Sequence, residues 1–185
     1  MEFVRALIIA IFCLAAWPAS ADAWHLQRNS TFSFEASFEA APLEGSFTDF
    51  DVRFEFDPQE PTGSSLQVTV ALAGADMGDS DLNEAITAQE WFDVKGFSHA
   101  QYSSDDIVET APGSYIAHGV LVLKGIEREV AVPFVWSRSA DLATMRGEFM
   151  LKRSDFNIGT GEWASGEQIG IDVKLRFDLQ LERAN

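Results

Sequence analysis

The residue types that most often do chemistry are scattered in this sequence rather than grouped. The three histidines, His25, His99 and His118, lack the spacing of metal ligands. The chain has no nucleophile elbow, phosphate-binding loop or dinucleotide fingerprint. Acid–base catalysis needs paired carboxylates or a histidine-centred group on inward or loop positions, whereas most acidic residues here lie on the polar face of an alternating pattern. We therefore predict that this protein is not an enzyme.

One acidic stretch resembles a calcium-binding loop at first sight. It contains Asp76, Asp79, Asp81, Asn83 and Glu84. An EF-hand loop that began at Asp79 would need glycine at its sixth position, where this chain has Glu84. We predict no metal site there and interpret Asp79-Ser80-Asp81 as the cap of a helix.

The charge of the chain excludes two classes of partner. Asp and Glu number 29 against 13 Lys and Arg, which gives a formal net charge of −16. Such a surface repels the phosphates of nucleic acids and anionic lipid head groups. We expect no nucleic-acid partner and no attachment to an anionic membrane, and solubility accounts for most of this charge.

The first 23 residues are predicted to be a signal peptide. Arg5 precedes an apolar run from Ala6 to Ala16, which has the length of a signal-peptide core and is too short for the ~20 residues of a spanning helix. Cleavage is expected after Ala23 or, almost equally, after Ala21. The remaining residues, 24–185, make one domain that we expect in the periplasm. The single cysteine, Cys13, lies in the apolar run, so the mature chain is expected to have neither disulfides nor thiolate chemistry.

Alternation of apolar and polar residues dominates the rest of the chain. From Ile169 to Glu182 it continues without exception over fourteen residues, which a helix with its period of 3.6 cannot produce. Similar segments give eight predicted strands in all, at 32–39, 49–56, 66–72, 100–104, 115–123, 130–136, 145–152 and 169–182. Lys124-Gly125 is predicted to be a hairpin turn, and Asp79–Phe92 a short helix between the third and fourth strands.

Strands with one apolar face must bury it, either between two sheets or inside one closed sheet. Closure also removes exposed edges. Eight strands make a barrel that is filled by side chains or holds one small ligand. The predicted fold is thus all-β, an eight-stranded antiparallel lipocalin-like barrel with one short helix between strands 3 and 4.

The predicted inward faces are rich in phenylalanine and suit a flexible hydrocarbon, which gains ~0.8 kcal/mol per buried methylene. Alternation alone favours a filled core, because solid sandwiches also have apolar inward faces. If the barrel is hollow, we expect the lumen to be lined by Phe34, Phe50, Phe54, Phe56, Val68, Val70, Trp91, Phe92, Phe97, Tyr102, Leu121, Phe149, Phe156, Ile158, Val173 and Leu175. Among these, Trp91, Phe92 and Phe97 either gate the lumen or pack the helix on the barrel.

Two polar pairs have both a functional and a structural interpretation. Arg153 and Asp155 form either a polar collar at the barrel mouth or, as we favour, an ion pair or turn contact that closes the barrel. The hydroxyls of Tyr102 and Tyr115 could meet a ligand carbonyl, although buried tyrosines usually find a partner in any case.

Four segments match, in order, the motifs of one known family. They are Trp24 with Phe32-Ser33-Phe34 and Gly45–Phe50, then Trp91–Ala100, Gly119–Arg128 and Arg153–Gly159. Together they resemble the YceI-like, polyisoprenoid-binding family over nearly all of residues 24–185. The resemblance implies an extended lipocalin-like barrel that holds a long isoprenoid or related amphiphilic chain, in many members in the periplasm. This chain departs from the family in Gly78–Leu82, which lacks the Arg-Asp pair before the helix and the helix His, so a head-group contact made there in relatives is not expected.

These observations predict a periplasmic protein that carries or stores a long apolar isoprenoid-type lipid, either a polyprenyl chain or an isoprenoid quinone, and has no other cofactor. By analogy with relatives, a second copy of the chain and an inner-membrane b-type cytochrome are possible partners. The main alternative is an interaction module with a solid core, whose acidic outer face binds another exported protein. A lipid hydrolase or isomerase would instead require a polar constellation that converges inside the lumen.

Overall fold

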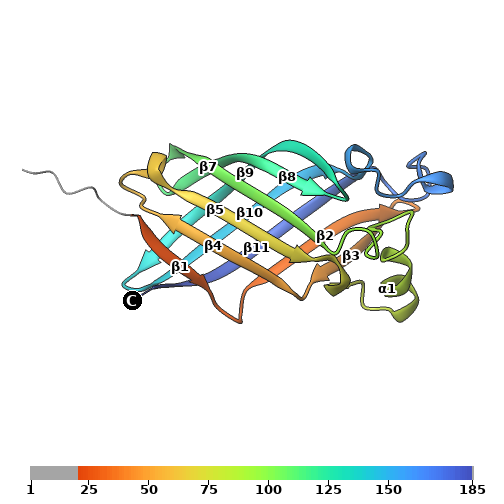
Figure 1. The fold of residues 1–185 in the computed structure, drawn as a ribbon, viewed down its shortest axis with the longest axis horizontal. Coiled ribbons are helices and arrows are strands. Elements are labelled where there is room, and N and C mark those ends of the chain that lie inside the picture. Colours follow the sequence, from red (N-terminus) through yellow and green to blue (C-terminus); the bar gives the residue numbers. More distant parts are fainter. Residues whose placement is uncertain (1–20, 185) are drawn as a thin grey trace, which may run out of the picture.

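The computed structural model describes residues 21–184, which form one closed antiparallel β-barrel (Figure 1). Its strands are β1 (Asp22–Leu26), β2 (Thr31–Phe38), β3 (Ala41–Phe47), β4 (Phe50–Phe56), β5 (Ser65–Ala71), β6 (Ala75–Asp76), β7 (His99–Ala111), β8 (Ser114–Leu123), β9 (Ile126–Ser139), β10 (Leu142–Lys152) and β11 (Asp172–Arg183). The α-helix α1 (Ser80–Ile86) follows β6, and four 3-10 helices lie in connections: η1 (Pro61–Gly63), η2 (Leu72–Gly74), η3 (Arg153–Phe156) and η4 (Gly161–Trp163). Within residues 21–184, none of the helices is both long and apolar enough to cross a membrane.

The predicted signal peptide lies outside the described residues except for its last three positions. Arg5, the run from Ala6 to Ala16 and Cys13 all fall in the part of the chain that is not described. Of the two expected cleavage positions, Ala21 directly precedes β1 and Ala23 lies within it.

The barrel wall has eight strand positions. Two short strands follow one another along the wall at three of these positions: β1 and β2, β4 and β3, and β5 and β6. β1 and β2 both pair with β11, β1 along 181–183 and β2 along 174–178. In the same way β4 pairs with β1 and β3 with β2, and then β5 with β4 and β6 with β3. The ring β1-β4-β5-β7-β8-β9-β10-β11 closes where β11 pairs back to β1. The predicted eight-stranded barrel, with its short helix between the third and fourth positions, is confirmed.

Some strand boundaries differ from the predicted ones. β7 continues to Ala111, beyond the predicted end at Ser104, because a bulge between Ser104 and Asp106 allows its pairing with β8 to resume. β11 begins at Asp172, since Ile169 forms only an isolated bridge to β2. The prediction also omitted β1, β3 and β6: β1 and β6 have only five and two residues, and β3 contains Pro42 and Gly45, which weaken a strand pattern.

The helix begins where its cap was predicted and ends earlier. The Asp79 carboxylate accepts hydrogen bonds from the backbone N–H groups of Asp81 (2.9 Å) and Leu82 (3.1 Å). The last helical residue is Ile86 rather than Phe92, because residues 87–97 form a series of tight turns with their own backbone hydrogen bonds. The helix is therefore two turns long and lies at the right-hand end of the barrel in Figure 1.

Aromatic rings fill the opposite end of the barrel. Six of them form a cluster that we call the aromatic plug: Trp24, Phe54, Phe56, Tyr115, Phe134 and Trp136. Adjacent rings in the plug have centroids 4.8–6.0 Å apart. Rings of β4 meet rings of β9, although β5, β7 and β8 separate these two strands in the ring order. The plug contacts therefore cross the barrel axis, and this end of the barrel is solid.

Candidate functional site

The half of the barrel nearest α1 is hollow and contains two adjoining cavities. The inner cavity has about 890 Å³ of empty space and the outer cavity about 1370 Å³, including space that is continuous with solvent. Five residues line both cavities: Phe47, Phe92, Leu123, Leu151 and Leu175. Because the cavities share these walls, we describe them together as the lumen.

The lumen runs from the helix end of the barrel to the aromatic plug. The inner cavity is lined further by Phe32, Phe50, Val52, Leu66, Val68, Val70, Leu72, Ala100, Gln101, Tyr102, Leu121, Val130, Val132, Met145, Phe149, Phe177 and Leu179. The outer cavity is lined further by Phe34, Ala36, Phe38, Leu43, Met77, Leu82, Ala85, Ile86, Trp91, Arg153, Phe156, Ile158, Trp163, Ile169 and Val173. Several inner residues, such as Val52, Leu66 and Met145, also pack on the plug, so the lumen is blind at that end.

Thirteen of the sixteen predicted lining residues line the lumen: Phe34, Phe50, Val68, Val70, Trp91, Phe92, Tyr102, Leu121, Phe149, Phe156, Ile158, Val173 and Leu175. The other three, Phe54, Phe56 and Phe97, line neither cavity. Phe54 and Phe56 point inward but lie in the plug, because alternation gives the face of a residue and not its depth along the axis. Phe97 lies outside the lumen against the β8–β9 turn, where a Cβ on Gly125 would come 2.8 Å from its ring.

The sequence prediction also missed lining residues that a recognisable signal could have supplied. Phe32 and Leu151 share the inward phase of the predicted residues Phe34 and Phe149 on the same strands. Leu82 and Ile86, in contrast, come from α1, whose position over the barrel opening depends on tertiary packing.

Two glycines allow rings to lie flat against the wall of the lumen. Gly45 is opposite Phe34 on the neighbouring strand, and Gly147 is opposite Phe177. A Cβ at either position would collide with the ring that faces it. Because glycine leaves this space free, the two rings occupy the wall rather than the centre of the lumen.

Polar side chains contribute almost nothing to the inner cavity. The Tyr102 hydroxyl donates to the carbonyl oxygens of Ala117 (2.8 Å) and Val130 (3.2 Å), so it is already engaged with the barrel wall. Burial raises the pKa of Tyr102 to about 12, which keeps the hydroxyl neutral. Gln101, the other polar residue, is exposed. The inner cavity can therefore solvate a hydrocarbon chain but offers no group for acid–base chemistry.

Arg153 organises the rim of the outer cavity. Its side chain is buried, and its five N–H groups donate to five backbone carbonyls at 2.6–3.0 Å, those of Ile158, Gly159, Trp163, Ile169 and Gly170. The guanidinium also lies 5.5 Å from the ring centroid of Trp91. Asp155 is exposed, and no carboxylate within residues 21–184 forms an ion pair with Arg153. Arg153 thus makes the turn contact that we favoured, without an ion pair, and its burial lowers the pKa of the guanidinium.

The β8–β9 hairpin turn ties two other segments to this rim. Lys124 and Gly125 have φ values of 51° and 72°, as the predicted hairpin turn requires. The Lys124 Nζ donates to the carbonyl oxygens of Gln89 (2.7 Å) and Asn157 (2.8 Å). Burial lowers the pKa of Lys124, and the carboxylates of Asp93 and Glu90 oppose that change. The lysine therefore fastens the turns after α1 to the loop between β10 and β11.

The acidic stretch around α1 has a structural role. The Asp76 carboxylate accepts hydrogen bonds from the Gly78 N–H (2.9 Å) and the Asn83 amide (3.1 Å), which lower the pKa of Asp76. Asp79 caps the helix, as described above. Across residues 21–184, no three His, Cys, Asp or Glu side chains converge into a group that could hold a metal ion.

Comparison with known proteins identifies the family to which this barrel belongs. The family model of the YceI-like domain matches residues 24–181. The chain belongs to the YceI-like family. The resemblance inferred from the four sequence segments is therefore confirmed. Among solved structures, the crystal structure of BcnA from Burkholderia cenocepacia is similar to this chain with a TM-score of 0.81 and 31% identity, over 84% of this chain and 98% of that one.

Two UPF0312 proteins and one further solved structure are similar to this chain at lower sequence identity. A UPF0312 protein of Ectopseudomonas mendocina is 29% identical over 139 residues, which cover 72% of this chain and 73% of that protein. A UPF0312 protein of Photorhabdus laumondii is 27% identical over 88 residues, only 48% of this chain and 45% of that protein. The structure of a polyisoprenoid binding domain from Saccharophagus degradans, implicated in plant cell wall breakdown, has a TM-score of 0.71 at 16% identity and covers 89% of this chain and 99% of that one. At this identity the last comparison shows a shared fold.

Proposed function

We propose that this protein binds one long, apolar lipid of the isoprenoid kind in the lumen and carries or stores it in the periplasm without changing it chemically. The observation that carries the proposal is the lumen itself, which is lined almost entirely by hydrocarbon and aromatic side chains and is blind at the plug. Each methylene buried there contributes ~0.8 kcal/mol. The fold shared with the polyisoprenoid binding domain of Saccharophagus degradans supports the choice of lipid.

The geometry also bears on the alternative functions. The alternative of an interaction module requires a barrel with a solid core, whereas the part of this barrel nearest α1 is hollow. A lipid hydrolase or isomerase needs polar groups that converge on the substrate. In this lumen, the side chains of Tyr102 and Arg153 instead donate hydrogen bonds to backbone carbonyls. Binding is thus the function that this site supports best. A quinone as the lipid, a second copy of the chain and a b-type cytochrome as partners stay predictions.

The test is extraction of lipid from protein purified from its native host. Mass spectrometry of the organic extract should detect a long-chain isoprenoid in an amount close to that of the protein. Leu175 lines both cavities, so Leu175→Trp should fill the passage between them and remove most of the lipid. Val135 lies on the outside of β9 and is 54% exposed, so Val135→Trp is the matched control and should keep the lipid.

Two results would contradict the proposal. One is a parent protein that yields no lipid although it is folded. The other is a Leu175→Trp variant that retains as much lipid as Val135→Trp, since the lipid would then be bound outside the lumen.

We further propose that export ends with cleavage after Ala21. The Asp22 carboxylate lies 3.1 Å from Arg138 Nη1 and 3.5 Å from Arg183 Nη1, and Asp22 and Ala23 pair with β4. Cleavage after Ala23 would remove both ion pairs and the first two residues of β1. The intact mass of protein from the periplasmic fraction should correspond to a chain that begins with Asp22, and a chain that begins with Trp24 would contradict this choice.

A further inference from the structure

We infer that the open end of the lumen selects lipids with an uncharged head group over lipids that end in phosphate or pyrophosphate. The inference rests on the proposed function and concerns the part of the lipid that cannot enter the inner cavity. Because the lumen is blind at the plug, an amphiphilic chain has to enter tail first. Its head group then remains at the rim of the outer cavity, beside Phe38 and Leu82, which line this cavity and are 43% and 41% exposed.

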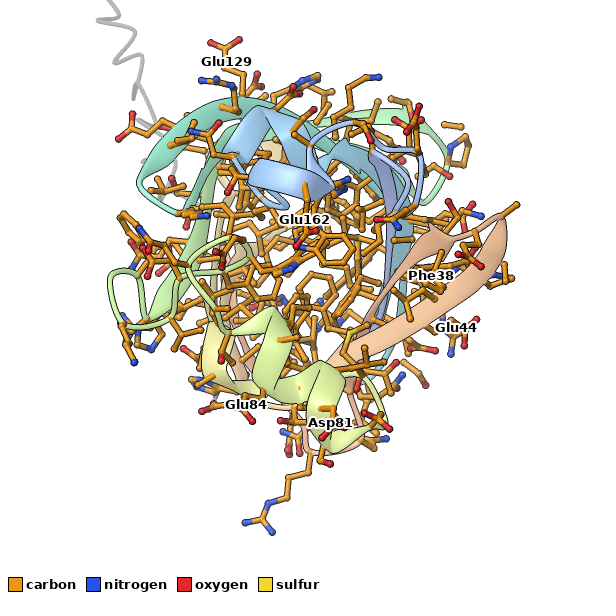
Figure 2. The ribbon with its side chains drawn as sticks, turned by 90° about the vertical axis from the view of Figure 1, so that its right-hand side faces the viewer. Phe38, Glu44, Asp81, Glu84, Glu129 and Glu162 are labelled. Carbon is orange, nitrogen blue, oxygen red and sulfur yellow. The ribbon has the colours of Figure 1, made fainter. Side chains whose placement is uncertain are left out.

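Carboxylates surround this rim. Figure 2, which looks at the open end, shows Glu44 on β3, Asp81 and Glu84 on α1 and Glu162 in η4 on different sides of it. The segments that build this end, residues 39–44, 76–98, 124–125 and 153–170, contain three basic residues, Lys95, Lys124 and Arg153. Against these stand eleven acidic residues: Glu39, Glu44, Asp76, Asp79, Asp81, Glu84, Glu90, Asp93, Asp155, Glu162 and Glu167.

The cations near the lumen do not offset these carboxylates at the rim. Arg153 is the one charged side chain among the residues that line the two cavities. All five of its N–H groups donate to carbonyl oxygens, so none is free to bind a phosphate oxygen. Lys124 is likewise bonded to the carbonyls of Gln89 and Asn157.

A charged head group would therefore be repelled without a compensating hydrogen bond. A phosphate monoester carries about −1.5 to −2 charges at pH 7, and carboxylates within the Debye length of ~8 Å at physiological salt act on it with little screening. A neutral alcohol or carbonyl head group feels no such repulsion. The acidic rim thus acts as a filter for the head group, whereas the lumen binds the chain.

The test compares two probes with the same twenty-carbon chain, geranylgeraniol and geranylgeranyl phosphate. Each probe displaces a fluorescent apolar dye from delipidated protein, at low and at high salt. We expect the alcohol to bind at least about tenfold more tightly at low salt, and the difference to shrink at high salt as the repulsion is screened.

A charge-reversal variant with a matched control assigns the effect to the rim. Glu44, Glu84 and Glu162 at the rim are all exposed, as are Glu55, Glu60 and Asp105 away from it. The triple substitution Glu44→Lys, Glu84→Lys and Glu162→Lys should tighten binding of the phosphate about tenfold and leave the alcohol unchanged. The triple substitution Glu55→Lys, Glu60→Lys and Asp105→Lys changes the net charge equally and should have a much smaller effect.

The outcomes separate the inference from the proposed function. If neither probe binds, the proposed function fails. If both bind equally at both salt concentrations, or if the phosphate binds more tightly, the head-group filter is refuted while lipid binding stands. If both triple variants act alike, the net charge of the protein and not its rim discriminates between the probes, which also refutes the inference.

Discussion

At the plug end of the barrel, aromatic rings meet across the axis, whereas at the helix end they lie along the wall. Phe54 and Phe56 of β4 reach Phe134 and Trp136 of β9, with centroids 5.0–6.0 Å apart. Near α1, in contrast, the rings of Phe34 and Phe47 contact each other from the neighbouring strands β2 and β3, and Phe47 also contacts Phe92 in the turns after α1. Both ends are built from strands with the same inward alternation. The difference shows that a barrel of this size becomes solid or hollow according to whether its rings cross the axis or lie against its own wall.

The two ends therefore have different tasks. The plug residues are packed together and almost completely buried, and we expect the plug to contribute more to the stability of the barrel than the helix end. The helix end gives up packing energy to keep the lumen open, and glycines at 45 and 147 help by leaving room for rings on the wall. The predictions below test this division.

The largest effect is expected from Phe56→Ala in the plug. Phe56 is 0% exposed and contacts the rings of Phe54, Tyr115 and Trp136, and loss of a buried phenylalanine side chain costs about 3–5 kcal/mol. Phe149→Ala is the matched substitution in the lumen, where Phe149 is only half-buried, and should cost roughly 1–2 kcal/mol. Urea unfolding of delipidated protein measures both.

Lipid binding should respond in the opposite order. Phe149→Ala should change the affinity for geranylgeraniol, whereas Phe56→Ala should leave it unchanged if the variant folds. Should Phe56→Ala not fold, Phe56→Leu provides a milder test at the same position. Equal losses of stability at the two positions would show that the helix end is packed as densely as the plug.

An intermediate effect is expected at the rim of the helix end. Arg153→Met removes the donors to five carbonyls, two of them buried and three part-buried, and should lower the free energy of unfolding by about 2–4 kcal/mol. Arg153→Lys keeps the charge but has only three N–H donors, so it should fall between the parent and Arg153→Met.

Hydrogen exchange shows where this loss occurs. In Arg153→Met the amides of the loop between β10 and β11, such as those of Ile158 and Gly170, should exchange faster, whereas those of β4 in the plug region should change only with global stability. A uniform change over the whole barrel would mean that Arg153 does not act on the rim specifically.

The fold could largely be predicted from sequence, because period-two alternation is a local property. The eight strand positions, the capped helix and the Lys124-Gly125 turn all follow from short stretches of residues. The ends of the elements could not be predicted in the same way. α1 stops at Ile86 and β7 continues past Ser104 because of turns and a bulge that tertiary contacts stabilise.

The division into plug and lumen could not be predicted from alternation. Phe54 and Phe50 occupy the same inward phase of β4, yet Phe54 is in the plug and Phe50 lines the lumen. Which of these occurs depends on the residues across the barrel, which come from strands far away in the sequence. The role of Arg153 is hidden for the same reason, since its five carbonyl partners are arranged only when the loop between β10 and β11 folds around it.

The smallest effect is expected from surface ion pairs, and it also compares the two ends. Asp22→Asn removes contacts to Arg138 and Arg183 beside the plug, where the Asp22 side chain is 34% exposed. Asp172→Asn removes one contact to Lys152, and there the carboxylate side chain is 63% exposed and the distance is 3.5 Å. Because surface pairs are weak and screened by salt, we expect Asp22→Asn to lower the Tm by no more than about 3 °C, and Asp172→Asn to have almost no effect. The decrease for Asp22→Asn should disappear in 1 M salt. A decrease in Tm that persists in 1 M salt would mean that Asp22 supports β1 by something other than charge. The protein used is exported protein whose mass shows that it begins with Asp22. If its Tm does not decrease in low salt, these two ion pairs do not stabilise the plug end.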